Sequence, residues 1–314
     1  MIRWLQHSLH VRLRTLFCWG LLFCAVSAEM VAAEVVIVDS NKHPESFELA
    51  QSISLYCPPC GTLQYMDMQR DLAIGRQIVA ELRAREQAGT LEVVIALGPL
   101  AARLAGRELR RTPVFYLMRE PVPDDMPQGS HVTALAGPPS VTMQLTAFKA
   151  LVPDMRRVGL LLRRSTAAPV YDELVAAAKE LGVGLSFFYV DRPEDVSPGL
   201  RQAIGETDGL MFLRDSMVIN GDTIRFILRL TLENRVPTFT YSPELVAMGM
   251  GAAVHLDQRK LARHVGAVVT ARLNGEQSAP NTAEPFVLEI NASALGNRPA
   301  QAATRILGME VVER

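Results

Sequence analysis

The sequence predicts an α/β fold made of two lobes, each built around a doubly wound parallel sheet. Three observations support this prediction. Short apolar runs such as Val35–Val38 and Leu91–Leu97 recur along the chain, and such runs are typical of strands buried on both faces. Segments with helical spacing of apolar residues separate them, an order that produces right-handed βαβ units. The chain of 314 residues is long enough for two domains of ordinary size.

The first lobe is predicted from a series of strands and helices that begins after residue 33. Its first strand is a run of β-branched residues that ends in the polar pair Asp39–Ser40. Gly98-Pro99 ends a later strand and opens a helix, since proline is tolerated in the first turn of a helix. The expected strands are Val35–Val38, Thr62–Met68, Leu91–Leu97 and Pro113–Leu117, and the expected helices are Ser46–Leu55, Arg70–Glu86 and Leu100–Glu108.

The second lobe is predicted from a similar series beyond Pro138. Helix and strand alternate again, and the crossovers are long enough to join parallel strands. The expected helices are Val141–Leu151, Tyr171–Leu181, Gly199–Ile204, Asp222–Asn234 and Leu261–Leu273, and the expected strands are Val158–Leu162, Leu185–Val190, Gly209–Leu213 and Val236–Tyr241.

Residues 1–33 differ from the rest of the chain. Three arginines precede the apolar run Leu16–Val26, which is too short to span a bilayer comfortably. Small residues follow, so that cleavage after either Ala28 or Ala33 fits the pattern. This pattern predicts a secretory signal peptide and therefore a periplasmic protein, with an uncleaved membrane anchor as the alternative.

Composition and charge exclude several classes of function. Hydrophobic residues make up 49% and charged residues 21% of the chain, as in an ordinary packed protein. Without the leader, 29 basic and 32 acidic side chains remain, which argues against nucleic acid or an anionic membrane as a partner. The nucleophile-elbow, zinc-protease and phosphate-loop motifs are absent. We therefore expect a monomer that is not an enzyme and holds no metal or cofactor.

The cysteine pair Cys57-Pro-Pro-Cys60 supplies the two thiols that remain after the leader is removed. In an oxidising compartment, the spacing predicts a local disulfide in the turn between the first helix and the second strand. The alternative is a thiol-disulfide oxidoreductase, which needs its first cysteine at a helix N-terminus after a strand. A metal site would need a second Cys/His pair nearby.

Several segments in both halves of the chain share their order and spacing with one known family. They are Val94–Ala102, Thr112–Val122, Gln144–Pro153, Arg157–Leu161, Gly209–Ser216, Val236–Val246, Met250–Ala253 and Leu288–Gly296. On these segments the chain resembles the ABC transporter substrate-binding proteins, a family whose studied members bind aromatic amino acids. The resemblance covers roughly Val93 to Gly296.

This resemblance implies the type I periplasmic-binding-protein fold, in which the chain crosses between the lobes three times and hinge closure traps the ligand. Mapped onto this sequence, the resemblance implies crossings near Ala136–Pro139, Ser242–Glu244 and Ser278–Pro285. The glycine and proline residues there suit such connections, with plain turns as the alternative. The first lobe would then hold residues 34–137 and 244–280, and the second lobe residues 138–243 and 281–314. The implied function is delivery of a small organic ligand, such as an amino acid, to an ABC permease. The alternative is a sensing subunit for a membrane kinase or receptor.

Ligands of open parallel sheets lie beyond the carboxyl ends of the strands. Arg119 there could bind a ligand carboxylate, or it could be solvated or paired within the protein. The resemblance places Asp215 where relatives have an aspartate that suits a ligand amine. Tyr241 could offer apolar surface or belong to the core. The full set of candidate ligand-binding residues is Ser40, Gly98, Met118, Arg119, Ser165, Asp215 and Tyr241.

Overall fold

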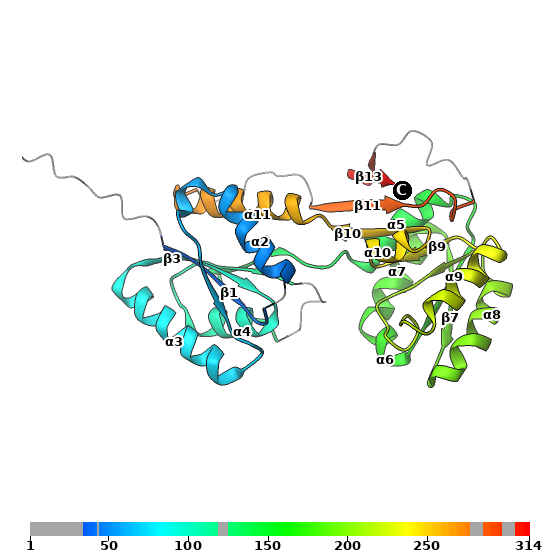
Figure 1. The fold of residues 1–314 in the computed structure, drawn as a ribbon, viewed down its shortest axis with the longest axis horizontal. Coiled ribbons are helices and arrows are strands. Elements are labelled where there is room, and N and C mark those ends of the chain that lie inside the picture. The colour runs from blue at the N-terminus through cyan, green and yellow to red at the C-terminus, as the bar shows by residue number, and fades with distance from the viewer. Residues whose placement is uncertain (1–33, 43, 119–124, 277–284, 297–304) are drawn as a thin grey trace, which may run out of the picture.

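The computed structural model describes residues 34–42, 44–118, 125–276, 285–296 and 305–314. Two sheets organise these residues: a sheet of five strands in the order β2-β1-β3-β4-β5, and a sheet of eight in the order β12-β13-β11-β10-β9-β8-β6-β7. Figure 1 shows them as two lobes side by side, the first mostly blue and cyan and the second mostly green and yellow. The predicted signal peptide lies outside the described residues.

The first lobe has a fully parallel sheet. Asp71 accepts hydrogen bonds from the first turn of α3, and Gly89 ends that helix in the left-handed conformation, as expected for caps. The elements are β1 (Glu34–Asp39), α2 (Pro44–Leu55), the 3-10 turn η1 (Pro58–Cys60), β2 (Gln64–Asp67), α3 (Leu72–Ala88), β3 (Leu91–Leu97), α4 (Pro99–Glu108), β4 (Val114–Leu117) and β5 (Val132–Ala136).

The second sheet is parallel from β7 to β10 and mixed at its other end. There β11 runs antiparallel to β10, and β12 runs antiparallel to β13. The elements are α5 (Val141–Leu151), β6 (Arg157–Leu162), α6 (Arg164–Ala167), α7 (Tyr171–Leu181), β7 (Gly184–Tyr189), α8 (Val196–Glu206), β8 (Gly209–Met211), α9 (Ile224–Glu233), β9 (Thr238–Thr240), α10 (Pro243–Ala247), β10 (Ala252–Leu256), β11 (Phe286–Ile290), β12 (Arg305–Ile306) and β13 (Met309–Glu313).

Helices cover both faces of the first sheet. Alternate residues of β1 point to opposite faces, as in any strand. Val35 and Ile37 pack with α2 and with α11 (Gln258–Leu273), whereas Val36 and Val38 pack with α3 and α4. In Figure 1, the orange α11 lies beside the blue α2 although the two are far apart in sequence. The unbroken β-branched run of β1 is therefore explained by burial on both faces, and a late segment of the chain completes the first lobe.

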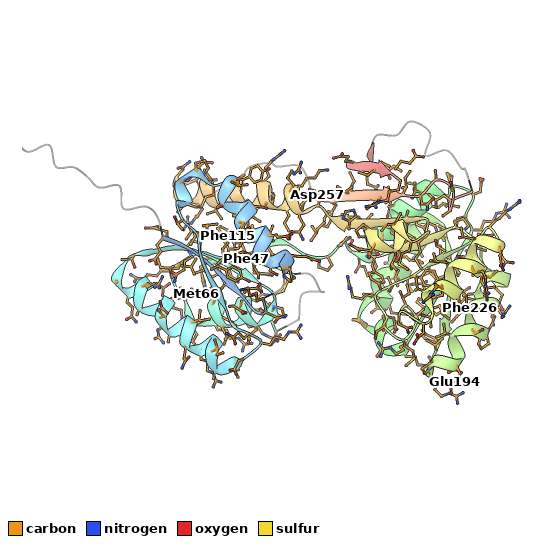
Figure 2. All side chains as sticks on the ribbon, in the orientation of Figure 1. Phe47, Met66, Phe115, Glu194, Phe226 and Asp257 are labelled. Carbon is orange, nitrogen blue, oxygen red and sulfur yellow. A yellow bond between two sulfur atoms is a disulfide. The ribbon has the colours of Figure 1, made fainter. Side chains whose placement is uncertain are left out.

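The chain passes between the lobes at Asp257, which Figure 2 labels at their junction. This position corrects the crossing predicted at Ser242–Glu244, because β10 pairs with both β9 and β11. Residues 244–256 thus lie with the second sheet and not, as predicted, with the first lobe. Pro243 occupies the first turn of α10, a position that favours proline as much as a hinge does.

The other two passages join β5 to α5 and α11 to β11. The first runs through residues 137–140 and ends at Ser140, whose hydroxyl caps α5. The third passage, from α11 to β11, includes residues 277–284, which lie outside the described part of the chain. Pro285 accepts a hydrogen bond from the Asp257 amide at 2.9 Å, so the second and third passages adjoin. None of the helices in the described residues is long and apolar enough to cross a membrane.

Candidate ligand-binding site

In each sheet, the carboxyl ends of the parallel strands lie on the side from which the chain departs for the other lobe. The chain leaves the first sheet at the end of β5, which is parallel to β4, and leaves the second sheet at the end of β10, which is parallel to β9. We call the residues after β1, β3 and β4 the first rim and those after β6, β8 and β9 the second rim. The first rim is Asp39–Lys42, Gly98–Pro99 and Met118; the second rim is Arg163–Thr166, Arg214–Ser216 and Tyr241–Ser242.

Ser40 and Gly98 of the first rim shape the beginning of α4. The Ser40 hydroxyl oxygen accepts a hydrogen bond of 2.9 Å from the Ala101 amide, which satisfies one of the unpaired donors at that helix end. Gly98 has a φ of 82°, and a Cβ added there would lie 2.9 Å from the Ser40 hydroxyl oxygen. Met118 is 2% exposed and belongs to the core against α4. Ser40 and Met118 are thus already engaged within the protein.

Asp39 is a buried acid of the first rim that is held by a tyrosine. The Tyr65 hydroxyl donates to Asp39 Oδ2 at 2.6 Å, and the Asn41 amide donates to Oδ1 at 3.1 Å. Burial raises the pKa of Asp39 above its ordinary value despite these hydrogen bonds. Burial, with the neighbouring carboxylate, also raises the pKa of Tyr65. Tyr65 was not among the predicted site residues, since its approach to Asp39 depends on the pairing of β2 with β1.

Asp215 lies in the second rim with its side chain fully buried. Its Oδ1 accepts hydrogen bonds from Arg163 Nε at 2.9 Å and from the Met217 amide at 3.0 Å. Its Oδ2 accepts from the Arg163 amide at 2.8 Å and from the Thr166 hydroxyl at 2.7 Å. Burial alone would raise the pKa of Asp215, but the hydrogen bonds from Thr166, Arg163 and Met217 hold it below its usual value. The carboxylate is therefore ionised and joins the ends of β6 and β8.

Arginines dominate the second rim. The Arg163 side chain is 38% exposed and uses its Nε atom on Asp215. The Arg214 guanidinium lies over the Tyr241 ring at 4.6 Å, and that of Arg164 lies over the Tyr189 ring at 4.1 Å. Burial raises the pKa of Tyr241, so its ring stays neutral beneath Arg214. None of these three arginines was predicted as a site residue, although basic residues directly after two strands were a visible signal.

The remaining predicted site residues are placed as follows. Ser165 is exposed on α6, and Tyr241 is partly buried beneath Arg214. Arg119 lies outside the described residues. The structure thus brings Ser165, Asp215 and Tyr241 together on the second rim, and Ser40, Gly98 and Met118 together on the first.

Cys57 and Cys60 form a close pair away from both rims. Their Cα atoms are 5.4 Å apart, which is within the range for a disulfide, and both residues are 1% exposed. Their turn packs on α11 at Gly266, where an added Cβ would lie 2.6 Å from the Tyr56 carbonyl oxygen. Cys57 follows helix α2, precedes the three-residue 3-10 turn η1 and is buried, whereas a catalytic thiol needs exposure. No cluster of potential metal ligands occurs in the part of the chain described.

The comparisons with known proteins agree on the fold. A family model described as ABC transporter substrate binding protein matches residues 62–309. A ligand-free, open substrate-binding protein with adhesive properties from Clostridium difficile matches with a TM-score of 0.71 and 16% identity, over 90% of this chain and 99% of that one. No curated protein matches.

Two further solved structures carry ligands. An ABC domain from Streptococcus pneumonia in complex with L-Trp has a TM-score of 0.52 and 18% identity, covering 84% of this chain and 94% of that one. A solute-binding protein from Bacillus halodurans with bound myo-inositol has a TM-score of 0.51 and 14% identity, covering 88% and 99%. Identities this low indicate a shared fold alone. The predicted class, an α/β protein of the type I periplasmic-binding-protein fold, is confirmed.

Proposed function

This chain belongs to the ABC transporter substrate-binding protein family, and we propose that it captures a small organic ligand between its two lobes for an ABC importer. One observation carries the proposal: in both sheets, the carboxyl ends of the parallel strands adjoin the passages between the lobes. Ligands of such sheets bind at strand ends. A ligand held by one rim can therefore be covered by the other through a rotation about residues 137–140 and Asp257.

The proposed compartment is the periplasm. The leader of residues 1–33 has the charge pattern and length of a signal peptide, and the close pair Cys57 and Cys60 suits an oxidising compartment. Among the predicted contacts that the structure describes, we propose that Tyr241 and Ser165 face the ligand. Gly98 shapes the surface opposite, and Asp215 positions Arg163.

Thermal unfolding in the presence of candidate ligands tests this function. A ligand at about 100 times its dissociation constant adds about 2.7 kcal/mol to the free energy of unfolding. Small-angle X-ray scattering of the same samples should show a smaller radius of gyration when the lobes close. Amino acids, carboxylates, sugars and inositols make up the panel. A panel without any stabilising compound, or binding that leaves the radius unchanged, would contradict capture by lobe closure.

A further inference from the structure

The carboxylate of Asp215 has no acceptor capacity left for a ligand. An ionised carboxylate offers about four acceptor positions, and Asp215 receives hydrogen bonds from Arg163 Nε, the Arg163 amide, the Met217 amide and the Thr166 hydroxyl. Its side chain has no exposed surface. A ligand ammonium would have to displace an internal donor from a buried position, which costs more than the new contact returns.

The guanidinium groups of the second rim are in the opposite situation. Arg163 uses one of its five N–H donors on Asp215. Within the described residues, its terminal Nη groups have no hydrogen-bond partner. Arg214 is exposed and stacks on Tyr241, and the described chain gives it no carboxylate. Guanidinium donors form a planar fork that matches the oxygens of a carboxylate or phosphate.

The charge of the second rim is positive as a whole. It contains Arg163, Arg164 and Arg214, and its carboxylate is that of Asp215. Glu244, two positions after the rim residue Ser242, accepts a hydrogen bond from the Ser242 hydroxyl, and this hydrogen bond holds the pKa of Glu244 below its usual value. With Glu244 counted beside Asp215, the three arginines still exceed the two carboxylates at this rim. The excess of cationic donors on this rim has to be balanced by water or by an anionic ligand.

We infer that this site takes an organic oxyanion, bound by Arg163 and Arg214 with its organic body against Tyr241, and that a ligand amine is not required. The inference rests on the proposed function, because it names the substrate class of the same site. It also separates this chain from an amino-acid binder. Recognition of an amino acid needs an acceptor for the ammonium group, and the buried Asp215 does not supply one.

Isothermal titration calorimetry with chemically matched probes tests the inference on the full-length protein. Indole-3-propionate, L-tryptophan and tryptamine share one ring system and differ in their charged groups. Succinate and phenyl phosphate extend the oxyanion class to a dicarboxylate and a phosphate, and D-ribose and myo-inositol represent neutral ligands. We expect the tightest binder to be an oxyanion without an amine. Tryptamine and the neutral probes should bind at least about tenfold more weakly.

Two variants locate the anion. Arg214→Gln should weaken binding of the best oxyanion at least about tenfold, and Arg214→Lys should retain part of it. Arg229→Gln is the matched control, because Arg229 lies over the Phe226 ring at 5.8 Å but on α9, away from the rim. The affinity of the Arg229→Gln variant for the best oxyanion should equal that of the unmodified protein.

The outcomes separate the inference from the proposed function. Tighter binding of L-tryptophan, tryptamine, ribose or inositol than of every oxyanion without an amine would overturn the inference and leave the proposed function intact. An oxyanion affinity that Arg214→Gln leaves unchanged would overturn the inference in the same way. Absence of binding by all probes would count against both.

Discussion

The two rims differ in how far their polar groups are satisfied within the protein. On the first rim, the Ser40 hydroxyl serves α4 and Asp39 is held by Tyr65. On the second rim, Asp215 is saturated but Arg163 and Arg214 keep donors to spare. Under the proposed function, this difference gives the two lobes different roles. We propose that the second lobe supplies charge and selects the ligand, whereas the first lobe supplies a preformed surface that closes over it.

The largest effect on stability is expected from Asp215→Asn. An amide keeps one acceptor oxygen and turns its NH₂ group toward the donors on Arg163 or Thr166. We expect a loss of about 2 to 4 kcal/mol in the free energy of unfolding, measured with urea at pH 7. Asp222→Asn, on an exposed loop of the same lobe, is the matched control and should stay within about 0.5 kcal/mol.

The pH dependence provides a second check on Asp215. Its folded-state pKa is lowered, so its contribution is complete above the ordinary carboxyl pKa and is lost as pH falls through the lowered value. Asp215→Asn should therefore flatten the acid limb of the stability profile. An unchanged acid limb would mean that the carboxylate is not ionised in the folded protein, which would break the proposed contrast between the rims.

Replacing Cys57 and Cys60 together by serine tests a region that belongs to neither rim. We expect a loss of about 1 to 3 kcal/mol, because the pair closes a short loop against α11. Ligand affinity measured by calorimetry should be unchanged. Alkylation followed by mass measurement should find both thiols blocked in periplasmic protein. Free thiols would contradict the predicted disulfide. Weaker ligand binding would show that the turn influences the site through α11.

Strands could be predicted from the sequence where burial requires a continuous run of apolar residues. The strand expected at Leu91–Leu97 is β3 residue for residue, because a run buried on both faces is continuously apolar. The strand β5 was missed, since Val132–Ala136 is half-exposed at a sheet edge and has neither an apolar run nor strict alternation. Asp215 was recognised as a strand-end residue. Its partners Arg163 and Thr166 are about 50 residues away, and no local pattern reveals such a contact.

The first rim is tested by Gly98→Ala. Its φ of 82° disfavours any side chain, and the new Cβ would lie 2.9 Å from the Ser40 hydroxyl oxygen. We expect a loss of about 1 to 2 kcal/mol. Gly182→Ala is the control for positive φ alone, because Gly182 has the left-handed helical conformation and nothing within 4 Å of the added Cβ. The loss should be larger at Gly98, because its ψ of 175° suits glycine alone and Ser40 is in contact with the new Cβ. An equal loss at the two positions would contradict a constrained surface on the first rim.

The smallest effect is expected from Tyr65→Phe, and the size of the stability loss depends on pH. Removing the hydroxyl takes one donor from Asp39 Oδ2, so the pKa of Asp39, already raised by burial, should rise further. A raised carboxyl pKa costs stability as pH increases through the interval between the unfolded and folded values. The variant should therefore lose about 1 kcal/mol at pH 7 and less near pH 4, where Asp39 is protonated more often. Urea unfolding at both pH values measures the difference. A loss that is equal at the two values would mean that Asp39 does not ionise in this range, and the first rim would then carry no charge to set against the arginines of the second.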